Sequence, residues 1–130
     1  MAVLTAEMQE LVKKSACYVA TADRQGRPNL GPKGSTKVLD DQTLYFAEVT
    51  GGRTLANLRE NPWAAIVALD VKNRHGYRFA GPASVIEEGE LLARAKEELA
   101  PLGLTPQAVV TVRVEEIYSL DPGSAGKRLA

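Results

Sequence analysis

Two apolar runs, residues 44–47 and 63–69, are joined by the sequence Thr50-Gly51-Gly52-Arg53-Thr54-Leu55-Ala56-Asn57-Leu58-Arg59-Glu60-Asn61-Pro62. Two glycines at the end of a strand let the backbone turn and leave its N–H groups free. Leu55 and Leu58 lie three residues apart, and an Asn-Pro pair ends the apolar spacing. The stretch therefore predicts a strand, a glycine turn, a short helix and a second strand.

The start of this predicted helix combines the groups that a phosphate site requires. Free N–H groups after Gly51 and Gly52, the positive end of a helix, the Arg53 guanidinium and the Thr54 hydroxyl all occur there. The spacing matches neither the P-loop nor the GxGxxG motif. An ordinary turn with a helix cap has the same composition, so the residues alone leave both interpretations open.

The composition is that of an ordinary globular chain. With 130 residues, 45% hydrophobic and 25% charged, we expect one domain over residues 1–130. Sixteen basic residues balance sixteen acidic ones, which argues against nucleic acid or an anionic membrane as a partner. No apolar run is long enough to span a membrane, and Glu7 and Glu10 interrupt any signal peptide. The only cysteine, Cys17, is predicted to be buried, and we expect a cytoplasmic protein.

Hydrophobic periodicity predicts three helices, near residues 5–15, 53–61 and 90–100, and six strands, near residues 16–21, 29–39, 43–49, 63–69, 76–87 and 108–120. Turn signals between most neighbours favour an antiparallel sheet, and six strands in so short a chain indicate a small barrel. The strand at 29–39 contains Gly31, Pro32 and Gly34, which predict a bulge, an edge, or a backbone to which something comes close.

The only histidine, His75, falls in a polar segment between two predicted strands. A metal site needs several ligands, and no second histidine or cysteine lies nearby. We therefore expect His75 to be a solvent-exposed loop residue and predict no metal site.

Three motifs occur in a fixed order along the chain. A hairpin at residues 26–28 leads into an irregular strand at 33–40, the glycine-basic motif follows at 51–54, and a strand at 76–79 leads through Gly81 to an amphipathic helix. Together they resemble the pyridoxamine-phosphate-oxidase-like split β-barrel flavoproteins over about residues 15–87. The resemblance implies a mainly β fold with a few helices, a six-stranded antiparallel split β-barrel.

The resemblance also implies an FMN-binding homodimer with a flavin site at each end of the subunit interface. Arg53 and Thr54 take the positions of the phosphate-binding pair, and Gly52 stands where the full oxidases have serine. The strand from Lys33 to Thr36 corresponds to the one beside the flavin ring. The cofactor-binding residues implied in this way are Lys33, Gly34, Ser35, Thr36, Gly51, Gly52, Arg53 and Thr54.

The chain departs from the full oxidases at its C-terminus. The full oxidases have a longer C-terminal region with arginine, histidine and tryptophan, whereas this tail ends Gly126-Lys127-Arg128-Leu129-Ala130. We therefore expect an FMN-dependent oxidoreductase or electron carrier rather than a vitamin B6 oxidase, and assign no catalytic residue. Two alternatives stay open: a deazaflavin or haem in the same barrel, and a non-catalytic flavin-binding module.

Two further expectations concern charge and assembly. Lys33 beside the ring is expected to stabilise an anionic reduced flavin, and Glu48 is expected to pair with Lys33 or Arg53, because an unpaired carboxylate would repel a phosphate. Apolar surface in excess of what one small barrel hides is expected to form the dimer interface. The residues that motivate this interface are Trp63, Ile66, Val67 and the valines of strand 108–120.

Overall fold

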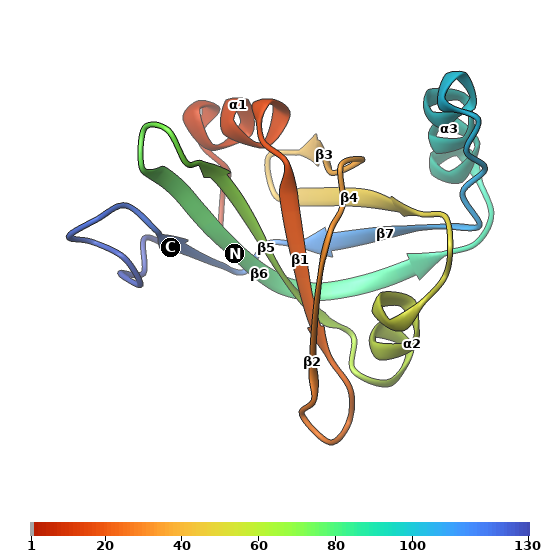
Figure 1. The fold of residues 1–130 in the computed structure, drawn as a ribbon, viewed down its shortest axis with the longest axis horizontal. Helices are drawn as coiled ribbons and strands as arrows, with labels where there is room; N and C mark the ends of the chain where they lie inside the picture. The colour runs from red at the N-terminus through yellow and green to blue at the C-terminus, as the bar shows by residue number, and fades with distance from the viewer. Residues whose placement is uncertain (1) are drawn as a thin grey trace.

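The computed structural model describes residues 2–130, which form three α-helices, one 3₁₀ helix and eight strands. In chain order these elements are α1 Ala6–Lys14, β1 Cys17–Ala22, β2 Pro28–Pro32, β3 Lys37–Asp40, β4 Thr43–Glu48, α2 Arg53–Glu60, β5 Trp63–Asp70, β6 His75–Ile86, α3 Glu90–Leu99, η1 Ala100–Leu102, β7 Ala108–Arg113 and β8 Glu116–Ser119 (Figure 1). The mainly β class with a few helices is confirmed.

The strands form one antiparallel sheet in the order β2-β1-β5-β6-β7-β4-β3, and β8 pairs with β6. The long strand β6 joins the two halves, because residues 75–82 pair with β5 and residues 83–86 pair with β7. At the change of partner, a Cβ on Gly81 would lie 1.8 Å from the Arg113 carbonyl oxygen, so only glycine fits. The edge strands β2 and β3 do not pair with each other, which leaves the barrel split.

Two of the six predicted strands are each divided in the structure, which gives eight. The strand predicted at 29–39 breaks at the turn Lys33–Thr36, where the Thr36 N–H donates to the Lys33 carbonyl over 3.1 Å. The strand predicted at 108–120 breaks between Arg113 and Glu116. Its apolar alternation shifts by one residue at the break, from Val114 to Ile117, and the prediction of one continuous strand overlooked this shift.

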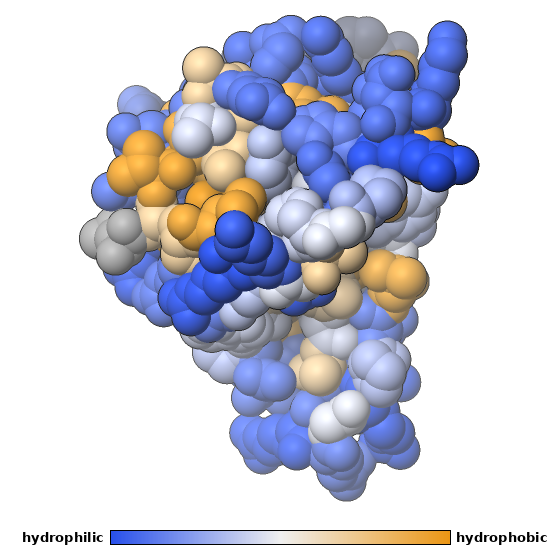
Figure 2. Space-filling model, turned by 90° about the vertical axis from the view of Figure 1, so that its left-hand side faces the viewer, coloured by the Kyte–Doolittle hydropathy of each residue, from blue (hydrophilic) through white to orange (hydrophobic). Residues whose placement is uncertain are grey.

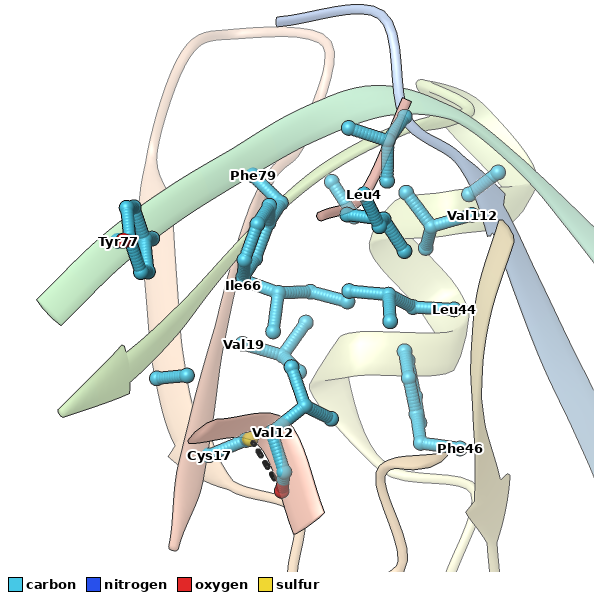
Figure 3. Close-up of a cluster of buried hydrophobic side chains, with 14 of the residues drawn as sticks. Leu4, Val12, Cys17, Val19, Leu44, Phe46, Ile66, Tyr77, Phe79 and Val112 are labelled. Carbon is cyan, nitrogen blue, oxygen red and sulfur yellow. Dashed lines mark hydrogen bonds between the residues drawn. The ribbon is translucent and has the colours of Figure 1, made fainter. Parts of the chain in front are cut away.

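Apolar side chains from α1 and from both sheet halves fill the space inside the split barrel (Figure 3). Phe46 and Phe79 are fully buried there. Tyr45 and Ala47, which alternate with Phe46 along β4, instead contact Leu92 and Ala95 of α3. Strand β4 is therefore buried on both faces, as its continuous apolar run predicts.

The outer helices begin and end close to their predicted positions. Helix α1 starts after Thr5, whose hydroxyl accepts a hydrogen bond from the Met8 N–H over 3.2 Å.

Figures 1 and 2 show the hairpin of β1 and β2 projecting from the rest of the molecule, with a mainly hydrophilic surface at its end. Within residues 2–130, no helix is long and apolar enough to cross a membrane.

The expected source of the dimer interface is wrong in part. Ile66 is fully buried, and the valines of β7 are also in the core, because both strands direct these residues into the barrel. The exposed apolar side chains of this sheet half lie on the outer face of β2, β1 and β5. Leu30 is 69% exposed, Tyr18 41% and Trp63 40%.

The structure confirms the prediction for the cysteine and corrects the one for the histidine. Cys17 is 1% exposed, and its burial raises the pKa of the thiol to about 11. His75 is not an exposed loop residue but begins β6, with its side chain 27% exposed between Glu7 and Asp121. The two acidic partners come from distant parts of the chain, so the local polar sequence gives no sign of them.

Candidate functional site

A buried ion pair joins the turn between β2 and β3 to the end of β4. Lys33 Nζ lies 2.7 Å from Glu48 Oε1, and the side chains are 18% and 2% exposed. The pairing expected for Glu48 is therefore present, with Lys33 as the partner. The other carboxylate oxygen, Oε2, is buried and has no hydrogen-bond partner within residues 2–130.

The hydroxyl groups of the same turn are engaged inside the chain. The Ala47 N–H donates to Ser35 Oγ over 2.9 Å, which extends the pairing of β4 beyond β3. The Thr36 hydroxyl donates to the Lys33 carbonyl over 2.7 Å. The backbone N–H groups of Gly34 and Ser35 donate to no group within residues 2–130. A Cβ on Gly34 would meet nothing within 4 Å, so the space beside this backbone is open.

These groups line a hollow of about 430 Å³, which we call the β4 hollow. Such a volume is within the range of small-molecule sites. Its apolar wall comes from the segment at and after the end of α3, and its polar wall from the turn and the end of β4. The lining residues are Pro32, Lys33, Gly34, Ser35, Ala47, Glu48, Val49, Thr50, Leu99, Leu102 and Leu104.

The glycine-basic motif begins α2 as predicted. Gly51 has φ +65°, a conformation that favours glycine, and a Cβ there would displace the flexible end of the Gln107 side chain, 2.7 Å away. Gly52 is the N-cap, and no side chain caps the helix. Arg53 is exposed and forms no ion pair with residues 2–130. The first turn of α2 therefore presents free N–H groups and one uncompensated cation.

Helix α2 is held against the β1–β2 hairpin by two amide-to-hydroxyl hydrogen bonds. Asn29 Nδ2 donates to Thr54 Oγ1 over 3.2 Å, and Asn57 Nδ2 donates to Thr21 Oγ1 over 3.1 Å. Thr54 is buried by this packing. Its hydroxyl thus positions the helix, while its proton is free to form a further bond.

Arg53 borders a second hollow, of about 270 Å³, which we call the hairpin hollow. It is lined by Asp23, Arg27, Pro28, Asn29 and Arg53. Within it, Asp23 Oδ2 lies 2.9 Å from Arg27 Nε. Hydrogen bonds from the backbone and side chain of Arg27 lower the pKa of Asp23. Because this aspartate is already paired with Arg27, Arg53 supplies the net positive charge of the hollow.

The predicted site residues thus fall into two groups that β2 connects. Asn29 borders the hairpin hollow and Lys33 the β4 hollow; at the usual rise of a strand they lie about 13 Å apart. The sequence prediction omitted Asn29 and the leucines after α3. The two-residue period of a strand would have placed Asn29 on the same side as Lys33, but no local signal links the leucines to β4.

The architecture agrees with the comparisons to known proteins. Residues 4–121 match the family model described as pyridoxamine 5'-phosphate oxidase. The chain therefore belongs to this family of split barrels. An uncharacterized protein of Methanocaldococcus jannaschii is 35% identical over 133 residues, which cover 98% of this chain and 88% of the relative. The crystal structure of HupZ from Group A Streptococcus is 36% identical, with a TM-score of 0.87, over 94% of this chain and 98% of that chain.

More distant structures share the fold alone. An FMN-binding protein of Syntrophomonas wolfei is 20% identical, with a TM-score of 0.77 over 87% of this chain and 83% of its own. HutZ, the haem storage protein of Vibrio cholerae, is 20% identical with a TM-score of 0.68 over 90% and 94%. An F420 reductase is 18% identical with a TM-score of 0.66 over 84% and 94%. The names of these proteins of the same fold thus refer to three different cofactors: FMN, haem and F420.

Proposed function

We propose that this chain is an FMN-binding flavoprotein, an oxidoreductase or electron carrier. The observation that carries the proposal is Arg53, an uncompensated cation on an uncapped helix N-terminus beside the hairpin hollow. Free N–H groups and a fixed cation are complementary to a phosphate. In this proposal Gly51, Gly52, Arg53 and Thr54 hold the phosphate of the cofactor.

The β4 hollow supports the second half of the proposal, because it combines an apolar wall with open backbone at Gly34. A flavin, when bound, supplies the redox chemistry, and the protein positions it and excludes water. Lys33 is neutralised by Glu48, so it contributes less to a reduced, anionic ring than its charge alone suggests. The N–H groups of Gly34 and Ser35 remain as donors toward such a ring.

We further propose that two chains associate through the outer face of β2, β1 and β5. Leu30, Tyr18 and Trp63 leave an apolar area on this face that one barrel does not cover. A homodimer with twofold symmetry would bury the same area on both subunits. Sedimentation at micromolar concentration measures the assembly directly, and a purely monomeric profile would contradict the dimer.

The phosphate assignment is tested by comparing FMN with riboflavin, which has the same ring but no phosphate. Arg53→Gln removes the cation, and we expect FMN affinity to fall about 10- to 100-fold while riboflavin affinity stays unchanged. Arg59→Gln is the matched control, because Arg59 lies on the same helix and pairs with Glu87 instead. Equal losses for both ligands in Arg53→Gln would contradict a phosphate role.

The nature of the cofactor is tested by the absorption spectrum and by the mass of any chromophore released from the purified protein. We expect FMN. A deazaflavin also has a flat ring and a phosphate, so it would fit the same two hollows, but it would supply different redox chemistry. Haem would need an iron ligand, and neither lining set contains histidine, cysteine or methionine. A colourless protein that does not bind added FMN would overturn the proposal. Turnover with NADH or NADPH separates an enzyme from a flavin-binding module.

A further inference from the structure

The buried carboxylate of Glu48 is only half satisfied. Its Oε1 accepts from Lys33, whereas Oε2 has no hydrogen-bond partner within residues 2–130. Glu48 is 1% exposed, so bulk water does not hydrate this oxygen freely. A buried ionised oxygen without a partner is unfavourable and rare. The residue also lines the β4 hollow, so a small rotation of its side chain would let a bound molecule provide the missing donor.

Hydrogen-bond donors surround this acceptor in the same hollow. The Lys33 ammonium has three N–H bonds, of which the pair with Glu48 uses one. The backbone N–H groups of Gly34 and Ser35 also donate to no group in residues 2–130. The lining thus offers one anionic acceptor together with several donors, and it is complementary to a ligand edge with one N–H and flanking carbonyl groups.

We propose that Glu48 and Lys33 recognise the cyclic imide edge of the ring that binds in the β4 hollow. The imide N–H donates to the Glu48 carboxylate, and the imide carbonyl oxygens accept from Lys33 and from the backbone of the turn. This inference rests on the proposed function, since FMN carries such an edge, as does a deazaflavin. The polar edge of haem carries propionates, which only accept hydrogen bonds and are repelled by Glu48.

Glu48 is then the residue that determines which ring the barrel accepts. A site built to bond an N–H discriminates strongly against a ligand that lacks it, because its buried acceptor stays unpaired. It discriminates further against a ligand that presents a like charge at the same place. The ion pair with Lys33 orients the carboxylate for this role.

The experiment compares FMN with its N3-methyl analogue, in which a methyl group replaces the imide hydrogen. Both are titrated into the full-length apoprotein, and binding is followed by flavin fluorescence. We expect the analogue to bind about 10- to 100-fold more weakly. In Glu48→Met, which removes the acceptor at similar length, the difference between the two flavins should nearly vanish. Glu98→Met is the matched control, since Glu98 pairs with Lys37, is not among the residues that line the β4 hollow, and should leave the difference intact.

The outcomes separate this inference from the proposed function. Equal binding of both flavins to the wild-type protein would overturn the role of Glu48 and leave FMN binding standing. Full discrimination retained in Glu48→Met would do the same. Binding of neither flavin would remove the proposed function and the inference together. If Glu48→Met does not fold, the comparison of the two flavins with wild-type protein still tests the role of Glu48. If the variant folds, haem should bind it more tightly than it binds the wild-type protein.

Discussion

Two groups of charged side chains are partly buried in this fold, and they differ in how far their carboxylates are exposed to water. Lys33 and Glu48 form a pair in which the carboxylate side chain is 2% exposed. His75 lies between Glu7 and Asp121, with each ring nitrogen 2.9 Å from a carboxylate oxygen, and these acidic side chains are 68% and 39% exposed. Water therefore reaches the carboxylates of the second group far more than that of the first, although the His75 Nε2 atom is itself buried.

In our proposal, that difference separates a structural group from a ligand-binding one. The histidine cluster joins α1, β6 and the chain after β8, three segments that the sequence keeps far apart, and its two acidic side chains are open to water. The lysine pair joins neighbouring segments and encloses an unpaired oxygen beside a hollow. The exposure of the carboxylates, rather than the number of charges, distinguishes the two groups.

The largest effect is expected from breaking the enclosed pair on the lysine side. Lys33→Met leaves the Glu48 charge buried without a partner, which costs about 3 kcal/mol of unfolding free energy. Glu48→Met should cost less, because Lys33 is 18% exposed and can turn toward water. The double variant, with two apolar side chains, should recover much of the loss of Lys33→Met. Urea denaturation of the apoprotein measures all three.

The exposed pair of Lys37 with Glu98 provides the control for that experiment. Its side chains are 49% and 27% exposed, so Lys37→Met should cost at most about 1 kcal/mol. Equal losses in Lys33→Met and Lys37→Met would mean that enclosure does not matter here. A double variant no more stable than Lys33→Met would point to lost packing instead of an unpaired charge.

The second prediction concerns the pH dependence of the histidine cluster. A hydrogen bond from the Gly76 N–H, together with the contact to His75, lowers the pKa of Asp121 below 3.8, the value of an unperturbed aspartate. A carboxylate with a lowered pKa stabilises the fold above the unfolded-state pKa, and this contribution is lost as the pH falls through the folded-state pKa. Asp121→Asn should therefore melt below the wild type at pH 7, and the difference should shrink on acidification below pH 3.8.

Melting temperatures of both proteins at several pH values between neutral and strongly acidic test this directly. Asp41→Asn, a change at the turn before β4 and outside the cluster, is the control. A gap between wild type and Asp121→Asn that stays constant across the acidic range would contradict the ionic role of Asp121.

Much of the fold was predictable because its signals are local. The alternation of β6, the continuous apolar run of β4 and the cap at Thr5 each reflect the residue's own surroundings along the chain. The new partners taken after the breaks at 33–36 and 114–115 were not predictable, because the local irregularities at these breaks do not say which strand pairs with which. The change of partner at Gly81 is a tertiary event with no local pattern of its own.

The candidate site divides in the same way. The glycine-basic start of α2 is a local motif, and the structure has it at a helix N-terminus as predicted. Glu48 was predicted to pair, but whether with Lys33 or Arg53 depends on how far β2 and the start of α2 lie from the end of β4. The leucines of the β4 hollow lie at the end of α3 and beyond it, some fifty residues from Glu48 along the chain. No local pattern in the sequence therefore links them to Glu48.

The smallest effect is expected from the hydrogen bond at the rim of the histidine cluster. The Tyr77 hydroxyl donates to Glu7 Oε1 over 3.1 Å, and Tyr77→Phe should cost about 1 kcal/mol, since the acceptor remains hydrated. Burial, with the nearby Glu7 carboxylate, raises the pKa of Tyr77 from 10.0 to about 12. The stabilisation is therefore complete below pH 10 and is lost as the pH rises toward 12.

Alkaline difference titration of tyrosinate absorbance, wild type minus Tyr77→Phe, isolates this phenol from the other three tyrosines. We expect it to ionise well above pH 10 while the protein is folded and near pH 10 in denaturant. Ionisation near pH 10 in the folded protein would mean that water reaches the phenol as it reaches Glu7. The cluster would then be open throughout, and the contrast with the enclosed Lys33–Glu48 pair would be sharper still.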